Sequence, residues 1–124
     1  MELINVELTE KELMELEGYN KRNLIRDGKY LNVFINDASW KVRKAVARQG
    51  YGLDILINDA NWKVRKAVAR QGYGLDKLIN DEEWAIRIEV ARQGYGLDKL
   101  INDKNWEVRD MAIEKLLEFY KNNK

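Results

Sequence analysis

The residue types that most often carry out catalysis are scarce in this chain of 124 residues. It has no histidine and no cysteine, so the commonest general base, the thiolate nucleophile and the usual ligands of zinc are missing. Ser39 is the only serine and Thr9 the only threonine, and Thr9 is explained as a helix cap. We therefore expect no enzyme, no metal and no cofactor. A hydrolase that works with carboxylates alone is the catalytic alternative, but the densest acidic cluster, residues 81–83, falls at a predicted helix start, where the helix dipole alone favours it.

Basic side chains form a stronger pattern, which the composition conceals. The chain has 22 Lys and Arg against 21 Asp and Glu, and a net charge of +1 favours no class of partner. Three positions nevertheless recur every 22 residues and change sign along the chain. They are basic in two segments (Lys41, Lys44, Arg48 and Lys63, Lys66, Arg70), then partly apolar (Ala85, Ile88, Arg92), then acidic (Glu107, Asp110, Glu114). Clustered basic residues are typical of phosphate contacts, and a solvated surface without a ligand is the alternative.

These positions belong to an internal repeat. The tryptophans are spaced 22 residues apart, at Trp40, Trp62, Trp84 and Trp106. Residues 37–58 and 59–80 differ at only two positions, and residues 81–102 keep the second half of the same pattern. A period between 20 and 50 residues indicates a solenoid, a propeller or an array of small units.

Each unit is predicted to contain one long helix and one short helix. In the first unit the long helix covers residues 37–49, with Asp37 as its N-cap and its valines buried. Gly50 ends this helix, because a positive φ costs little only for glycine. Residues 53–58 then form a short α or 3₁₀ helix with one apolar face. Neither helix can bury its apolar face alone, so stacking of the units must make the core.

The two ends are predicted to close a single domain that spans residues 1–124. Thr9 starts a capping box that opens a helix continuing to Leu16. At the other end Leu116 replaces the glycine stop, so the last helix should continue through Tyr120. The expected division is an N-terminal cap with a decayed repeat at 1–36, repeats at 37–58, 59–80 and 81–102, and a C-terminal capping helix at 103–124.

The long helix of the unit resembles a known repeat. The pattern Asp-x-x-Trp-x-Val-Arg-x-Ala-Val-Ala, at residues 37–47, resembles the first helix of HEAT-like repeats. The period and the short second element look closer to the leucine-rich repeat variant, in which an α-helix alternates with a 3₁₀ helix. The resemblance covers about residues 30–115. It implies an all-α, right-handed superhelix that supplies a binding surface and names no activity.

One recurring arginine is predicted to be structural. Arg43 lies inside the buried arc of its helix, and a buried guanidinium must be paired. The aspartates that begin the units are the obvious partners, and the HEAT-like resemblance implies the same pairing between neighbouring units. The predicted ladder consists of Asp37, Asp59, Asp81 and Asp103 with Arg43, Arg65, Arg87 and Arg109.

Three hypotheses of function follow from these patterns. The first is a protein-interaction scaffold, since arginine and tyrosine are frequent in binding hot spots. Its candidate contact residues are Tyr51, Tyr73, Tyr95, Ala85, Ile88 and Arg92. The second is nucleic-acid binding through the basic positions Lys41, Lys44, Arg48, Lys63, Lys66 and Arg70. The third is head-to-tail self-association, in which the basic end of one copy meets the acidic end of another.

The sequence also bears on where the protein acts. Residues 1–3 lack the basic start and small-residue cleavage site of a signal peptide. No apolar run approaches the ~18 residues that a membrane helix requires. We therefore expect a cytoplasmic protein whose partner is another protein or a nucleic acid and not a membrane.

Overall fold

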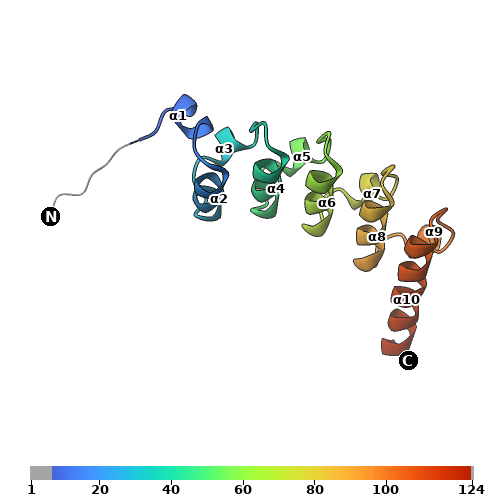
Figure 1. Ribbon diagram of the computed structural model, residues 1–124. Coiled ribbons are helices and arrows are strands. Elements are labelled where there is room, and N and C mark those ends of the chain that lie inside the picture. The colour runs from blue at the N-terminus through green and yellow to red at the C-terminus, as the bar shows by residue number, and fades with distance from the viewer. Residues whose placement is uncertain (1–6, 124) are drawn as a thin grey trace.

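The computed structural model describes residues 7–123, and every regular element in that range is a helix (Figure 1). Residues 1–3, on which the expectation about a signal peptide rests, lie outside the described residues. Among the described helices, none is both long enough and apolar enough to cross a membrane.

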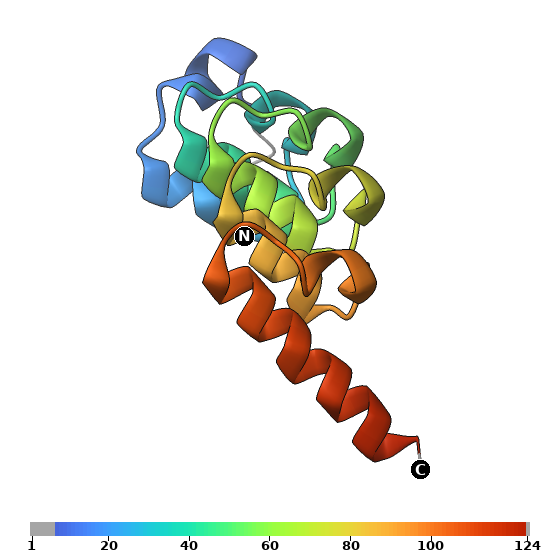
Figure 2. The same cartoon turned by 90° about the vertical axis from the view of Figure 1, so that its right-hand side faces the viewer.

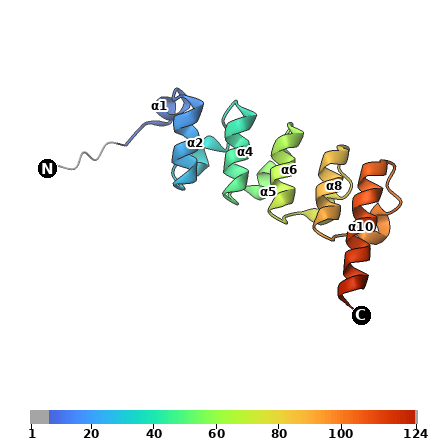
Figure 3. The same ribbon diagram turned by 60° about the horizontal axis from the view of Figure 1, so that its bottom comes forward.

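The helices are arranged in two layers, as in an α-solenoid. The long helices stand side by side in one row (Figures 1 and 3): α2 (Gly18–Arg26), α4 (Trp40–Arg48), α6 (Trp62–Arg70), α8 (Trp84–Arg92) and α10 (Trp106–Asn122). The second layer holds the short helices (Figure 2): α3 (Leu31–Phe34), α5 (Leu53–Leu56), α7 (Leu75–Leu78) and α9 (Leu97–Leu100). A further short helix, α1 (Glu10–Met14), covers the N-terminal end. The short elements, for which α and 3₁₀ conformations were both expected, are α-helical, and α10 continues through Tyr120 as predicted.

The core lies between the two layers and runs without interruption along the stack. Each long helix buries at least one valine or isoleucine, and each of the short helices of the second layer buries the leucine or phenylalanine at its last position. The largest fully buried side chains are Leu13, Ile25, Phe34, Val42, Val46, Leu56, Val64, Val68, Leu78, Ile86, Val90 and Leu100. Because each unit contributes only part of this core, each depends on its neighbours for burial.

The aspartate at the start of each unit precedes the helix and does not cap it. Helix α4 begins at Trp40, and its N-cap is Ser39. The prediction that Asp37 is the N-cap was therefore wrong. Its Oδ1 accepts from the backbone N–H of Ser39 at 2.9 Å, and its Oδ2 accepts from Lys21 Nζ at 2.7 Å. The carboxylate thus holds a turn in front of the helix and pairs with the preceding unit.

Other helices are capped by side chains. Thr9 and Glu12 form the predicted capping box at the start of α1, but this helix ends two residues before Leu16. The side chains of Asn61 and Asn105 accept from backbone N–H groups in the first turns of α6 and α10. An amide oxygen at this position satisfies donors that the helix itself leaves unpaired.

Two glycines shape the turn between the long and the short helix. Gly50 follows the end of α4 with φ of +76°, as the sequence predicted, and a Cβ there would make only an ordinary 3.8 Å contact. Gly52, the N-cap of α5, has φ of +64°, and a Cβ there would lie 2.2 Å from Cδ1 of Ile35. The position of Gly52 thus requires glycine for two reasons: its backbone conformation, and the close approach of Ile35 from the preceding unit.

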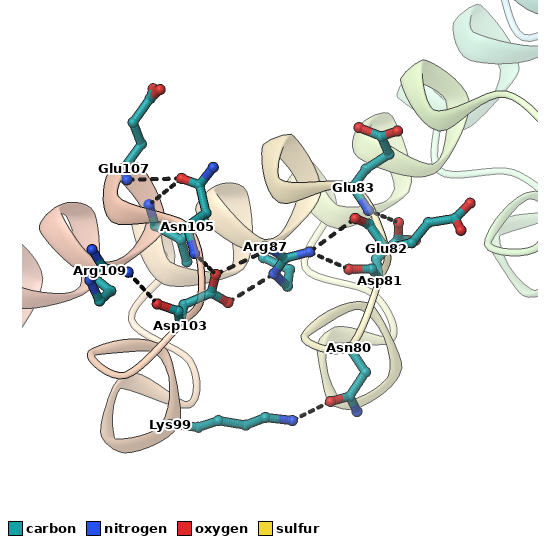
Figure 4. A network of polar contacts seen from close by, with 11 residues as sticks. Asn80, Asp81, Glu82, Glu83, Arg87, Lys99, Asp103, Asn105, Glu107 and Arg109 are labelled. Carbon is teal, nitrogen blue, oxygen red and sulfur yellow. Dashed lines mark hydrogen bonds and ion pairs between the residues drawn. The ribbon is translucent and has the colours of Figure 1, made fainter.

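A ladder of ion pairs joins consecutive units. Arg43 donates from Nε and Nη2 to the carboxylate of Asp59 at 2.7 and 3.1 Å, and from Nη1 to the carbonyl of Asp37 at 2.7 Å. Figure 4 shows the same arrangement around Arg87, which bridges Asp81 and Asp103. The other rungs are Lys21–Asp37 at 2.7 Å, Arg65–Asp81 at 2.9 Å and Arg87–Asp103 at 2.8 Å. Arg43, Arg65 and Arg87 are therefore paired within the fold as predicted. Arg109, also predicted as a member, donates to the carbonyl of Asp103 but pairs with no carboxylate within residues 7–123.

This ladder predicts a loss of stability in acid. Burial alone would raise the pKa of Asp59 and of Asp103, but hydrogen bonds and charge from Arg43 and Arg87, with a backbone N–H on each carboxylate, hold both pKa values below the ordinary range. The stabilisation is complete above the unfolded pKa of about 4 and is lost as pH falls through the lower folded pKa. We expect urea midpoints that change little between about pH 5 and 7 and fall below about pH 4. A midpoint that stays constant down to about pH 2.5 would contradict this expectation.

Candidate functional site

The basic side chains of the first units gather on the row of long helices. We call Arg22, Lys41, Lys44, Arg48, Lys63 and Lys66 the basic surface. One groove of about 220 Å³ lies between α2 and α4 and is lined by Arg22, Trp40, Lys41, Lys44 and Arg48. A second groove of about 220 Å³ lies between α4 and α6 and is lined by Lys44, Trp62, Lys63, Lys66, Ala67 and Arg70. Lys44 lines both grooves, so the basic surface is continuous across three helices.

The charges of the basic surface repel one another. Burial lowers the pKa of Lys44, and the positive charges of Arg48, Arg70, Lys63 and Lys66 lower it further. Burial also lowers the pKa of Lys66, together with the charge of Arg70, while Glu89 opposes this shift. Within residues 7–123 no carboxylate forms an ion pair with any member of the basic surface.

Aromatic rings lie among these cations. The Nζ of Lys63 is 4.5 Å from the centroid of the Trp40 ring, and those of Lys41 and Lys44 are 5.9 and 5.8 Å from it. Lys63 also lies 5.7 Å from the ring of Trp62. Ammonium groups at these distances are attracted to the ring face. The tryptophan rings thus attract lysines of the basic surface that have no carboxylate partner within residues 7–123.

The basic surface ends at α8, because this helix carries a carboxylate, that of Glu89, on the same side. Glu89 accepts from Arg92 at 2.6 Å and lies 3.6 Å from Arg70, so both arginines are paired. The partner candidates Ala85 and Ile88 on the same helix are half-buried, and Ile88 packs against the core. The charge sign along the row therefore changes at this helix, and the next helix carries Glu107, Asp110 and Glu114.

The recurring tyrosines lie apart from the basic grooves. Tyr51, Tyr73 and Tyr95 follow the C-terminal ends of α4, α6 and α8, and each is about 40% exposed. Neighbouring loops are joined there, because the side chains of Gln71 and Gln93 donate to backbone carbonyls of the preceding unit. The tyrosines therefore form an exposed edge along loops that are hydrogen-bonded to one another.

The outward face of α10 is apolar and uncovered within residues 7–123. Its position equivalent to the fully buried Ala47, Ala69 and Ala91 is occupied by Ile113, which is 45% exposed. Trp106, Leu117 and Tyr120 are exposed on the same helix. Head-to-tail self-association stays a prediction, because nothing in the described residues shows what meets this face.

Sequence reasoning missed several members of the site. Arg22 belongs to the first groove, and the signal was present, since it lies 22 residues before Lys44. Trp40 and Trp62 served in the sequence only to mark the repeat period, yet they line the grooves. Glu89 was not singled out, although it replaces an alanine of the earlier units and pairs two arginines.

Comparison with known proteins gives one match, at the C-terminal end. Residues 96–122 match the HEAT repeat family model. The HEAT match covers α9 and all of α10, that is, one short helix and the long helix after it. HEAT repeats generally mediate protein–protein interaction. No curated protein and no solved structure matches the chain.

Proposed function

We propose that this chain is a non-catalytic scaffold that binds a protein partner across its row of long helices. The observation that carries the proposal is the contrast between a constant framework and a variable surface. The ladder, the core valines and the turn glycines recur from unit to unit, whereas the three outer positions of each long helix pass from basic to apolar to acidic. A stack that repeats its framework and varies one surface is suited to recognition.

We further propose the architecture that such a scaffold requires. Residues 1–124 form one domain of 22-residue units wound into a right-handed superhelix, closest in type to the leucine-rich repeat variant. The N-terminal cap with its decayed repeat and the C-terminal capping helix close the ends. The recurring start of the long helices at a tryptophan and the HEAT match in the last unit support this assignment.

We place the partner site at the middle of the row, where the charge sign changes. Ala85 and Ile88 stand where the preceding units carry lysines, and Arg92 lies beside them. The exposed edge of Tyr51, Tyr73 and Tyr95 supplies amphipathic rings of the type that anchor interfaces. This placement gives the partner an apolar centre with polar surroundings, which is the usual anatomy of an interface.

Changing Ile88 to lysine should abolish partner binding without unfolding the protein. Lysine is the residue of the two preceding units at this position, so the fold accommodates it, but it places a charge at the centre of the proposed site. Ile55→Lys is the matched control, because it also introduces the lysine found at the equivalent position of other units. This position lies on the short-helix layer, where the equivalent residues Lys77 and Lys99 contact Asn58 and Asn80. Proteins retained on the immobilised wild-type chain are compared quantitatively with those retained by each variant, and retained candidates are then purified and titrated by calorimetry.

The proposal requires a purified partner that binds the wild type and Ile55→Lys and loses at least about tenfold in affinity, or about 1.4 kcal/mol, with Ile88→Lys. Ala85→Lys is a second variant at the same site, so that the conclusion about the site does not depend on Ile88→Lys alone. Partners that bind all the variants equally would refute the site. Thermal unfolding followed by circular dichroism confirms that each variant is folded.

A further inference from the structure

We propose that the basic surface binds single-stranded nucleic acid, with phosphates on its lysines and arginines and bases on Trp40 and Trp62. This site lies on α2, α4 and α6 and is separate from the protein site proposed on α8. It therefore does not rest on the scaffold function.

The first support is that the charge of the basic surface is uncompensated. Every arginine from Arg43 to Arg87 in the ladder has a carboxylate within 2.9 Å, so the fold neutralises the cations it needs for structure. The basic surface holds six cations close together with no carboxylate paired to them within residues 7–123. A polyanion would relieve this repulsion and release its own counterions, which is the main source of non-specific affinity for nucleic acid.

The second support is the shape of the surface. The two grooves meet at Lys44 and cross three adjacent helices. Helix axes pack about 8–10 Å apart, so the track is roughly 20 Å long. This length accommodates several consecutive phosphates of one strand. The end of the track is marked by Arg70 on α6 and Arg92 on α8, which are both paired with Glu89.

The third support is the tryptophan in each groove, which favours a single strand over other polyanions. Each groove contains a tryptophan, and both rings are partly exposed. A basic groove with aromatic side chains at intervals is typical of proteins that bind single strands, because unpaired bases can stack on the rings. A duplex keeps its bases stacked inside, and an acidic peptide offers carboxylates without flat rings. The lysines now over Trp40 would move to the phosphates when a base takes their place.

The test is a titration of four probes by fluorescence anisotropy at two salt concentrations. The probes are labelled 20-nucleotide random-sequence DNA and RNA single strands, the corresponding DNA duplex, and a poly-glutamate peptide of the same length. We expect micromolar binding of the single strands, a log–log salt slope of about −4 for six contacts, and quenching of tryptophan fluorescence. No binding of single strands at low salt, or equal binding of the duplex or of poly-glutamate, would overturn the proposal.

A matched pair of double variants locates the site. Lys44→Ile with Lys66→Ile uses the residue that the third unit carries there, and should weaken binding at least about fivefold and flatten the salt slope by about 1.4. Lys77→Ile with Lys99→Ile removes the same charge from the short-helix layer, where Ile55 already occurs, and should leave affinity unchanged. Equal losses in both pairs would show that only net charge matters and would overturn the assignment. Ile88→Lys should retain nucleic-acid binding, so this site and the protein site can fail independently.

Discussion

Replacing Asp103 by alanine is expected to lower the free energy of unfolding by about 3–5 kcal/mol. The pair it forms with Arg87 is the most buried of the arginine rungs, with side chains only 8% and 6% exposed. The alanine variant leaves the Arg87 guanidinium with the carbonyls of Asp81 and Glu82 as its only acceptors within the described part of the chain. A buried charge without its counter-charge is far more costly than the pair is favourable. Urea unfolding, followed by circular dichroism at neutral pH, measures the change.

Two further variants show whether burial causes the effect. Glu118→Ala breaks the exposed pair with Lys115, whose Nζ lies 3.2 Å from the carboxylate, and should cost less than about 0.5 kcal/mol. Combining Asp103→Ala with Arg87→Met removes the stranded charge and should recover much of the loss. A cost for Asp103→Ala as small as that for Glu118→Ala would show that the ladder contributes little.

Replacing Gly52 by alanine should destabilise the protein by about 2–5 kcal/mol. The backbone there is left-handed, which costs an ordinary residue about 1–2 kcal/mol. The new methyl group would also lie 2.2 Å from Cδ1 of Ile35, a buried side chain of the preceding unit, and displacing a packed core group costs a further 1–3 kcal/mol or so. Thermal and urea unfolding quantify the sum.

Gly50→Ala, two residues earlier in the same turn, is the matched control. It has a similar positive φ, but its Cβ would meet no atom closer than 3.8 Å. We expect it to lose only about 1–2 kcal/mol, the cost of the backbone conformation. The difference between the two variants therefore measures the contact between units. Equal losses would show that Ile35 moves aside at no cost.

The repeat made much of the architecture predictable. The periodicity and the apolar spacing gave the alternation of long and short helices, and the C-terminal helix runs past its missing glycine as expected. The position of Arg43 on the helical wheel indicated that it must be paired, and its partner is the aspartate of the next unit. These features depend on directions around a helix, which the sequence determines.

Other features depend on distances between units, which the sequence does not contain. Asp37 suits an N-cap by residue type, but its carboxylate is drawn to Lys21, so the helix begins three residues later. The need for Gly52 arises from a side chain 17 positions earlier, and no local propensity reveals it. Arg22 was overlooked because it lies in a unit whose sequence has decayed. Its spacing of 22 residues from Lys44 suggests that it is an equivalent position, and the assembled groove shows that it joins the basic surface.

The ladder also implies an order in which the chain can fold during synthesis. Its rungs join side chains 16 residues apart, and the glutamine bonds between loops reach 23 or 24 residues. Contacts so local allow fast folding, and none of these bonds has to wait for the far end of the chain. As the polypeptide leaves the ribosome, each exposed arginine needs only the next aspartate to emerge, so that the molecule can be completed one unit at a time from its N-terminus. Arg109, which donates to the carbonyl of Asp103 and to no carboxylate within residues 7–123, is where this succession stops.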